Sequence, residues 1–256
     1  MQVRLFYNAL LEATDTEIGN LLAQIDPVKR ANTMVFVIAD NGTPGHAMEP
    51  ALHDTSHSKL SVFEGGVRVP MIAAGYLVPR GPHETDALVH AVDLWRTLAE
   101  ITGASETRAA PLQPLDSISF RNQLVSPGSP SRRTEVFTQG FARPGAYQPT
   151  ANGPYEIACQ DPDAPGVYAW SPKVIGDHGR SLRDERYKLI VIQTAAAQDA
   201  LPQGLPDTPP QYAEKLYDLW TDPDEANDLI PLISSDQNLA AIRNQLRARM
   251  TEISGY

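Results

Sequence analysis

The chain has 256 residues, with 42% hydrophobic and 20% charged residues, which is enough to bury a sizeable core in one or two domains. Its 21 Lys and Arg residues against 31 Asp and Glu residues give a net charge of −10. This charge argues against a nucleic acid or an anionic membrane as partner, because either would need a basic face, but a local pocket can still bind an anionic substrate.

The sequence also argues against a membrane-spanning chain, a disulfide-bonded chain and a chain with a signal peptide. No apolar run approaches the ~18 residues of a membrane span. The single cysteine, Cys159, excludes an intrachain disulfide and a multi-cysteine metal site. Residues 1–15 lack the basic and then apolar pattern of a signal peptide, so the sequence as it stands predicts a cytoplasmic chain but otherwise leaves the compartment undetermined.

A helix is predicted first. Apolar residues recur at helical spacing from Phe6 to Ile25. Asp26-Pro27 should end this helix, because the residue before a proline avoids the helical conformation. An α/β domain rarely opens on a helix with no strand before it, so we expect the front of the domain to be missing from this sequence.

A buried strand is predicted next, over residues 33–39 (TMVFVIA). A continuous apolar, β-branched run without polar alternation is typical of a parallel sheet covered by helices on both faces. Residues 43–64 are polar and aperiodic and predict a long loop, which is often functional. Gly65 and Gly66 predict a sharp turn with positive φ or a close backbone approach, and Glu64 could pair with Arg68. A second strand should begin at Pro70, because a proline cannot donate to a strand ladder.

The rest of the chain divides into a helix and a small sheet. Residues 85–103 predict a helix capped by Gly103. Three short β-rich segments and a final helix over 236–253, with Ser234 and Gln237 as a capping box, predict a small antiparallel sheet with a C-terminal helix; the segments are 135–139, 187–192 and 215–219. The fold class is therefore α/β. Part of a large, mostly parallel sheet covered by helices occupies residues 1–125, and the antiparallel subdomain occupies residues 126–256.

The strongest site signal is Asp40-Asn41, directly after the first buried strand. Ligands bind beyond the carboxyl ends of strands in open parallel sheets, and carboxylate and amide oxygens suit a hard cation such as Ca²⁺ or Mg²⁺. Asp, Asn and Gly are also ordinary turn residues, so a plain turn is the alternative. Lys59 either offers a point charge to a sulfate or phosphate oxygen or is an exposed loop lysine.

Other polar residues carry weaker signals. The loop histidines are candidates for acid/base groups or ligands, although each one alone is more typical of a solvated side chain; they are His46, His53 and His57. Asp177-His178 follows only two apolar residues and predicts a loop rather than a second metal motif. Cys159 predicts an ordinary loop thiol.

The order of these segments resembles a known family. The series runs NTMVFVIADNG, SKLSVFEGGVRVPMI, AVDLWRTLAEITG, LDSISF, RYKLI and KLYDLWTDPDEANDL. From about Tyr7 to Leu229 it is similar to the C-terminal half of an arylsulfatase-type sulfatase of the alkaline phosphatase superfamily. This resemblance implies that Asp40 and Asn41 ligate the active-site Ca²⁺ and that Lys59 contacts the sulfate. It also implies that RYKLI and KLYDL are structural strands and that DPDEAND is an acidic turn.

The sequence differs from the sulfatase family in its nucleophile and in part of its calcium site. Sulfatases use a formylglycine made from a Cys/Ser-x-Pro-x-Arg signature, together with further acidic calcium ligands on a first strand, and this sequence has neither. The resemblance therefore implies hydrolysis of a sulfate ester of a small molecule or glycan, with the isolated chain inactive, a weak or incomplete Ca²⁺ site, and exposed apolar surface that favours self-association. Two alternatives stay open: a phosphate or phosphonate ester hydrolase of the same superfamily, and a non-catalytic remnant or partner protein.

Overall fold

The computed structural model describes residues 2–104, 116–141, 148–150, 153–156, 177–193 and 212–254. Cys159 lies outside these ranges. The chain forms two compact units, which are described separately. The first unit contains residues 1–59, 63–136 and 183–186, and the second contains residues 60–62, 137–182 and 187–256. No helix in the described ranges is long and apolar enough to cross a membrane.

The first unit contains helices and a pair of strands. Its elements are α1 (Gln2–Ala23), α2 (Pro27–Ala31), β1 (Met34–Ile38), η1 (Gly45–Ala47), η2 (Thr55–His57), α3 (Glu64–Val67), β2 (Met71–Gly75), α4 (Asp93–Thr102) and α5 (Arg121–Val125). The predicted N-terminal helix is confirmed, and Asp26 caps α2 by accepting from the N–H groups of Val28 and Lys29. Much of the apolar surface of α1 is exposed, including Val3, Leu5, Phe6, Leu10, Leu11 and Leu21.

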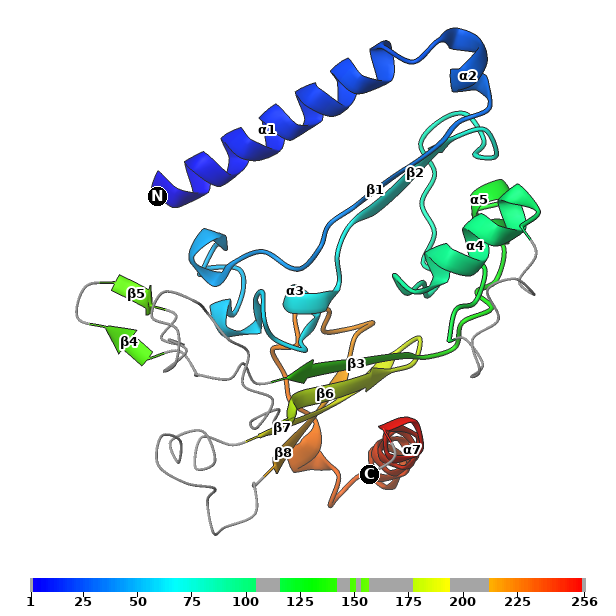
Figure 1. The fold of residues 1–256 in the computed structure, drawn as a ribbon. Coiled ribbons are helices and arrows are strands. Elements are labelled where there is room, and N and C mark those ends of the chain that lie inside the picture. The colour runs from blue at the N-terminus through cyan, green and yellow to red at the C-terminus, as the bar shows by residue number, and fades with distance from the viewer. Residues whose placement is uncertain are drawn as a thin grey trace, which may run out of the picture. The chain divides into compact units, whose positions relative to one another are not determined.

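The predicted first strand exists, but its surroundings differ from the expectation. β1 pairs antiparallel with β2, from Met34 opposite Gly75 to Ile38 opposite Met71, and Figure 1 shows the two strands side by side. In the described part of the chain this sheet has two strands only. The large parallel sheet is therefore not found there, and Ile38 and Ile72 are 38% and 62% exposed. A continuous apolar run predicts burial, but it does not specify the direction of the neighbouring strand.

The predicted helix over 85–103 is too long at its start. α4 begins at Asp93, whose carboxylate accepts from the backbone N–H of His90 at 2.8 Å and of Ile118 at 2.8 Å. Arg133 pairs with the same carboxylate through two nitrogens, at 2.7 and 2.5 Å. A carboxylate held in this way fixes the start of the helix, and Gly103 ends it with a φ of 67°, as predicted.

The second unit is built around a four-stranded sheet in the order β3-β6-β7-β8. These strands are β3 (Val136–Phe141), β6 (Asp177–Arg183), β7 (Tyr187–Gln193) and β8 (Tyr212–Asp218). A separate hairpin pairs β4 (Gln148–Thr150) with β5 (Gly153–Glu156), and η4 (Ile230–Leu232) precedes α7 (Gln237–Ser254). The predicted strands and final helix are confirmed. The loop predicted at Asp177-His178 is wrong, because these residues begin β6, a polar strand whose few apolar residues gave no periodic signal.

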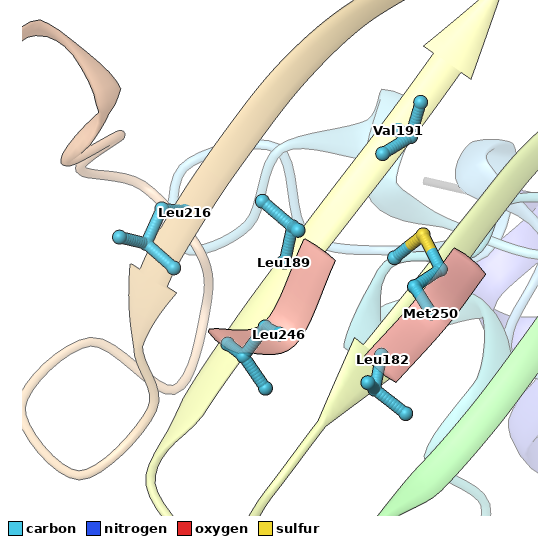
Figure 2. Close-up of a cluster of buried hydrophobic side chains, with 6 residues drawn as sticks. All are labelled: Leu182, Leu189, Val191, Leu216, Leu246 and Met250. Atoms are coloured by element: carbon cyan, nitrogen blue, oxygen red, sulfur yellow. The ribbon is translucent and has the colours of Figure 1, made fainter. Parts of the chain in front are cut away.

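The core of the second unit lies between this sheet and α7. Figure 2 shows side chains from β6, β7 and β8 meeting side chains from α7. The cluster consists of Leu182, Leu189, Val191, Leu216, Leu246 and Met250, all of them buried. The helix is capped by Asp236, which accepts from the N–H groups of Asn238 and Leu239 at 2.9 and 3.1 Å. Asp236 therefore takes the capping role predicted for Ser234, since it stands immediately before the helix.

The acidic turn after β8 is held in place by ion pairs and hydrogen bonds of its own carboxylates. Glu225 is 1% exposed and pairs with Lys188 of β7, also 1% exposed, at 3.0 Å. Asp222 accepts from two backbone N–H groups within the turn, at 3.0 and 2.8 Å. Asp228 accepts from the N–H of Leu216 at 3.1 Å and so attaches the end of the turn to β8. The acidic turn implied by the family resemblance is found here, and each of these three carboxylates has a specific partner.

Candidate active site

Asp40 and Asn41 stand where the sequence predicts, immediately beyond the carboxyl end of β1. Asp40 is exposed and Asn41 is half-buried. The Asn41 amide nitrogen donates to Asp40 Oδ1 at 3.0 Å and to the Gly42 carbonyl at 3.3 Å. A carboxylate and an amide are thus held together at the strand end, and the amide oxygen and carboxylate are the hard oxygen donors that Ca²⁺ prefers.

The long polar loop returns to this turn at Lys59. The backbone N–H of Lys59 donates to the carbonyl of Thr43 at 3.0 Å, so the end of the loop lies beside its beginning. Lys59 is half-buried. The next residue, Leu60, has a φ of 78°, in the left-handed region that a leucine rarely adopts. Such local strain is often found at functional sites, and here it directly follows the predicted sulfate contact.

Glycines make the close packing around the turn possible. The N–H of Gly42 donates to the Gly66 carbonyl at 2.9 Å. A Cβ on Gly42 would clash with the Gly65 carbonyl oxygen, and a Cβ on Gly65 would clash with the His57 carbonyl oxygen. The Asp40-Asn41 turn, α3 and the loop before Lys59 therefore meet backbone to backbone. Gly42 and Gly65 permit this close approach because neither has a Cβ atom.

The three loop histidines are in different environments. His46 and His53 are exposed. The ring of His57 is stacked on Phe63, with centroids 3.6 Å apart and an interplanar angle of 7°, and its Nε2 lies 3.7 Å from Asp54 Oδ2. Within the described residues, no group of three or more His, Cys, Asp and Glu side chains is placed to hold a metal ion.

The sequence did not indicate which residue pairs with Glu64, the first residue of α3. Glu64 pairs with Arg183, with Arg183 Nη1 donating to Glu64 Oε2 at 2.8 Å. The two side chains are 7% and 18% exposed, and they are separated by 119 positions in the sequence. Arg183 therefore takes the role predicted for Arg68, which is exposed. No local pattern could have indicated a partner so distant in sequence.

The first unit also contains a cavity that is not lined by Asp40, Asn41 or Lys59. A cavity of about 360 Å³ lies at the C-terminal end of α4, lined by Arg96, Ala99, Glu100, Gly103, Ala104, Ser119 and Arg132. The candidate site is instead an open turn, with Asp40 exposed at its tip.

Comparisons with known proteins bear directly on this region. The family model described as Sulfatase matches residues 2–104, the range that contains Asp40, Asn41 and Lys59. The resemblance to the sulfatases is confirmed. A sulfatase of Formosa agariphila is 32% identical over 134 residues, which cover 46% of this chain and 23% of that protein.

Solved structures share the fold over nearly the whole chain. BT4656, in complex with its substrate D-glucosamine-2-N,6-O-disulfate, matches with a TM-score of 0.58 and 16% identity, over 96% of this chain and 39% of that one. A phosphonate monoester hydrolase from Silicibacter pomeroyi matches with a TM-score of 0.52 and 20% identity, over 92% and 38%. The sulfatase-like chain thus spans less than half the length of each of these proteins.

Proposed function

We propose that this chain supplies the cation- and sulfate-binding part of a sulfatase active site and acts in the hydrolysis of sulfate esters. The observation that carries the proposal is the backbone hydrogen bond from Lys59 to Thr43, which brings Lys59 beside the Asp40-Asn41 turn that follows β1, within the range that matches the Sulfatase family. These residue types are what the reaction needs, since a sulfate ester is an anion whose charge must be neutralised as the bond to sulfur is attacked.

Each residue has a distinct part in this proposal. Asp40 and the Asn41 amide oxygen would hold Ca²⁺, and the cation, when bound, supplies Lewis-acid stabilisation of the sulfate oxygens. The hydrogen bond from the Asn41 amide nitrogen to Asp40 fixes the orientation of both side chains. The Lys59 ammonium would add a second positive charge toward the sulfate.

The chain by itself is proposed to be inactive. Its sequence contains no Cys/Ser-x-Pro-x-Arg signature, which is the source of the formylglycine nucleophile in sulfatases. Two oxygen donors on adjacent residues also leave most of the six to eight positions around Ca²⁺ to water. The exposed apolar residues of α1 and Ile72 of β2 favour self-association in solution.

The proposed substrate class is a sulfated small molecule or glycan. BT4656 was solved with a disulfated glucosamine, and a second structural match, BT1596, is described as a 2-O glycosaminoglycan sulfatase. The phosphonate monoester hydrolase among the structural matches favours one alternative, a phosphonate ester. Sulfate and phosphonate esters are similar in size and shape, so the residues described here suit either one.

The test is a chimera in which residues 2–104 replace the matching segment of the Formosa agariphila sulfatase. We expect the chimera to hydrolyse an aryl sulfate, and Asp40→Ala and Lys59→Ala each to lower kcat/KM by about a hundredfold or more. Asp86→Ala and Lys29→Ala, at exposed positions of the same unit, are matched controls that should leave the rate unchanged.

The isolated chain, assayed in parallel, should turn over no aryl sulfate. Turnover by the chain alone that disappears in Asp40→Ala would contradict the proposed inactivity. A chimera that prefers a phosphonate monoester to the aryl sulfate would favour the alternative.

A further inference from the structure

The candidate site depends on a helix that is too short to be stable alone. α3 has four residues, and an isolated single turn is not stable in water because helix nucleation is unfavourable. Yet the Gly66 carbonyl of α3 accepts the N–H of Gly42, and Gly65 packs against the backbone of His57. Whatever holds α3 in place therefore also holds the Asp40-Asn41 turn and the loop that returns at Lys59.

The strongest anchor of α3 is its first residue. Glu64 is 7% exposed and accepts a charge-assisted hydrogen bond from Arg183 at 2.8 Å. Arg183 is itself fixed, because its Nε donates to the carbonyl of Asp184 at 3.2 Å. The following turn is closed by Asp184, whose carboxylate accepts from the N–H of Arg186 at 2.7 Å. A buried carboxylate that loses such a partner is costly, so the pair constrains where α3 can lie.

We propose that Glu64 and Arg183 are positioning residues of the candidate active site: their ion pair holds α3 against Gly42 and His57 and so keeps Asp40-Asn41 and Lys59 in register. The catalytic meaning of this role rests on the proposed function, but the positioning itself does not. Neither residue is proposed to touch the substrate. Their effect passes through the backbone contacts of Gly42, Gly65 and Gly66.

Amide hydrogen exchange on the full chain tests the proposal without any activity measurement. In Glu64→Gln, the amides of Gly42 and Lys59 should exchange about tenfold faster or more, because the lost charge releases α3 and the hydrogen bonds that depend on it. The amide of Phe120, which donates to Thr97 Oγ1 in the same unit, should not change. The milder Arg183→Lys variant keeps the charge but loses the planar fork, and it should give an intermediate increase.

Two controls make the result specific. Glu214→Gln breaks a comparable partly buried ion pair with Arg243 in the second unit and should leave Gly42 and Lys59 unchanged. The exchanged pair, Glu64→Arg with Arg183→Glu, should restore slow exchange at both amides. Unchanged Gly42 and Lys59 exchange in folded Glu64→Gln would overturn the proposal. Equal acceleration at Phe120 would also overturn it, since the effect would then be general destabilisation.

Discussion

The two units differ in how completely they bury their own apolar side chains. In the second unit, Leu189, Leu216 and Met250 have 0% exposure between the sheet and α7. In the first unit, Phe6 and Leu10 of α1 are 71% and 66% exposed. Both regions carry clear apolar patterns in the sequence. An apolar pattern therefore indicates a face that favours burial, while the covering partner must be found in the structure.

The most completely buried side chains and the candidate active site lie in different units. The second unit contains an ion pair whose two side chains are each 1% exposed, and a cluster of buried hydrophobic side chains. The candidate active site lies in the first unit, on an exposed turn beside a two-stranded sheet.

The largest loss is expected from breaking the buried pair of the second unit. Glu225→Gln leaves the Lys188 ammonium without its charged partner in a fully buried position, and the free energy of unfolding should fall by about 3–5 kcal/mol. Urea unfolding followed by far-UV circular dichroism measures this change. The double variant Lys188→Met with Glu225→Leu removes both charges and should recover much of the loss. A single variant as stable as the wild type would show that the pair is not needed by the core.

The next effect compares equivalent truncations in the two units. Leu189→Ala removes a side chain with 0% exposure and should lower the free energy of unfolding by about 2–5 kcal/mol. Leu10→Ala removes one that is 66% exposed and should change it by less than about 0.5 kcal/mol. Thermal unfolding of both variants measures the difference. Equal losses would mean that α1 is buried in solution, for instance in a self-associated state.

A smaller, pH-dependent effect is expected at the start of α4. Burial alone would raise the pKa of the Asp93 carboxyl, but hydrogen bonds from Arg133 and two backbone N–H groups, with the Arg133 charge, outweigh it and lower the pKa. A lowered pKa in the folded state contributes stability above the unfolded value, about 3.9. That contribution is lost as the pH falls through the folded pKa.

Asp93→Asn tests this contribution. The variant should be less stable than the wild type at neutral pH and should lose less stability on acidification, because it lacks the carboxyl whose pKa is lowered in the folded state. Urea unfolding at neutral pH and below about pH 4 gives the comparison. An acid dependence identical to that of the wild type would show that Asp93 does not contribute.

Much of the fold could be predicted because its elements are local patterns. The strands at 34–38 and 187–193 are short β-branched runs, and the last helix follows helical spacing. The position of Asp40-Asn41 follows directly from the end of the first run. A strand's neighbours are set by distant segments, so the antiparallel pairing of β1 with β2 was not predictable.

The ion pair between Glu64 and Arg183 could not be predicted from the sequence for the same reason. Glu64 and Arg183 are 119 positions apart, and nothing periodic links them. Lys188 did give a usable signal, since it lies within a strand that is otherwise apolar on both faces. A lysine in such a strand needs a buried acidic partner, which the structure identifies as Glu225.

We propose that Asp40 and Asn41 form part of a sulfatase-type calcium site that the rest of this chain does not complete. Calorimetric titration of the chain with Ca²⁺ tests it most directly. We expect weak binding, with a Kd on the order of millimolar or weaker, since one carboxylate and one amide oxygen leave most ligand positions to water and the charge of Lys59 opposes the cation. A micromolar Kd that is lost in Asp40→Ala would contradict the claim, because other residues of this chain would then have to complete the site.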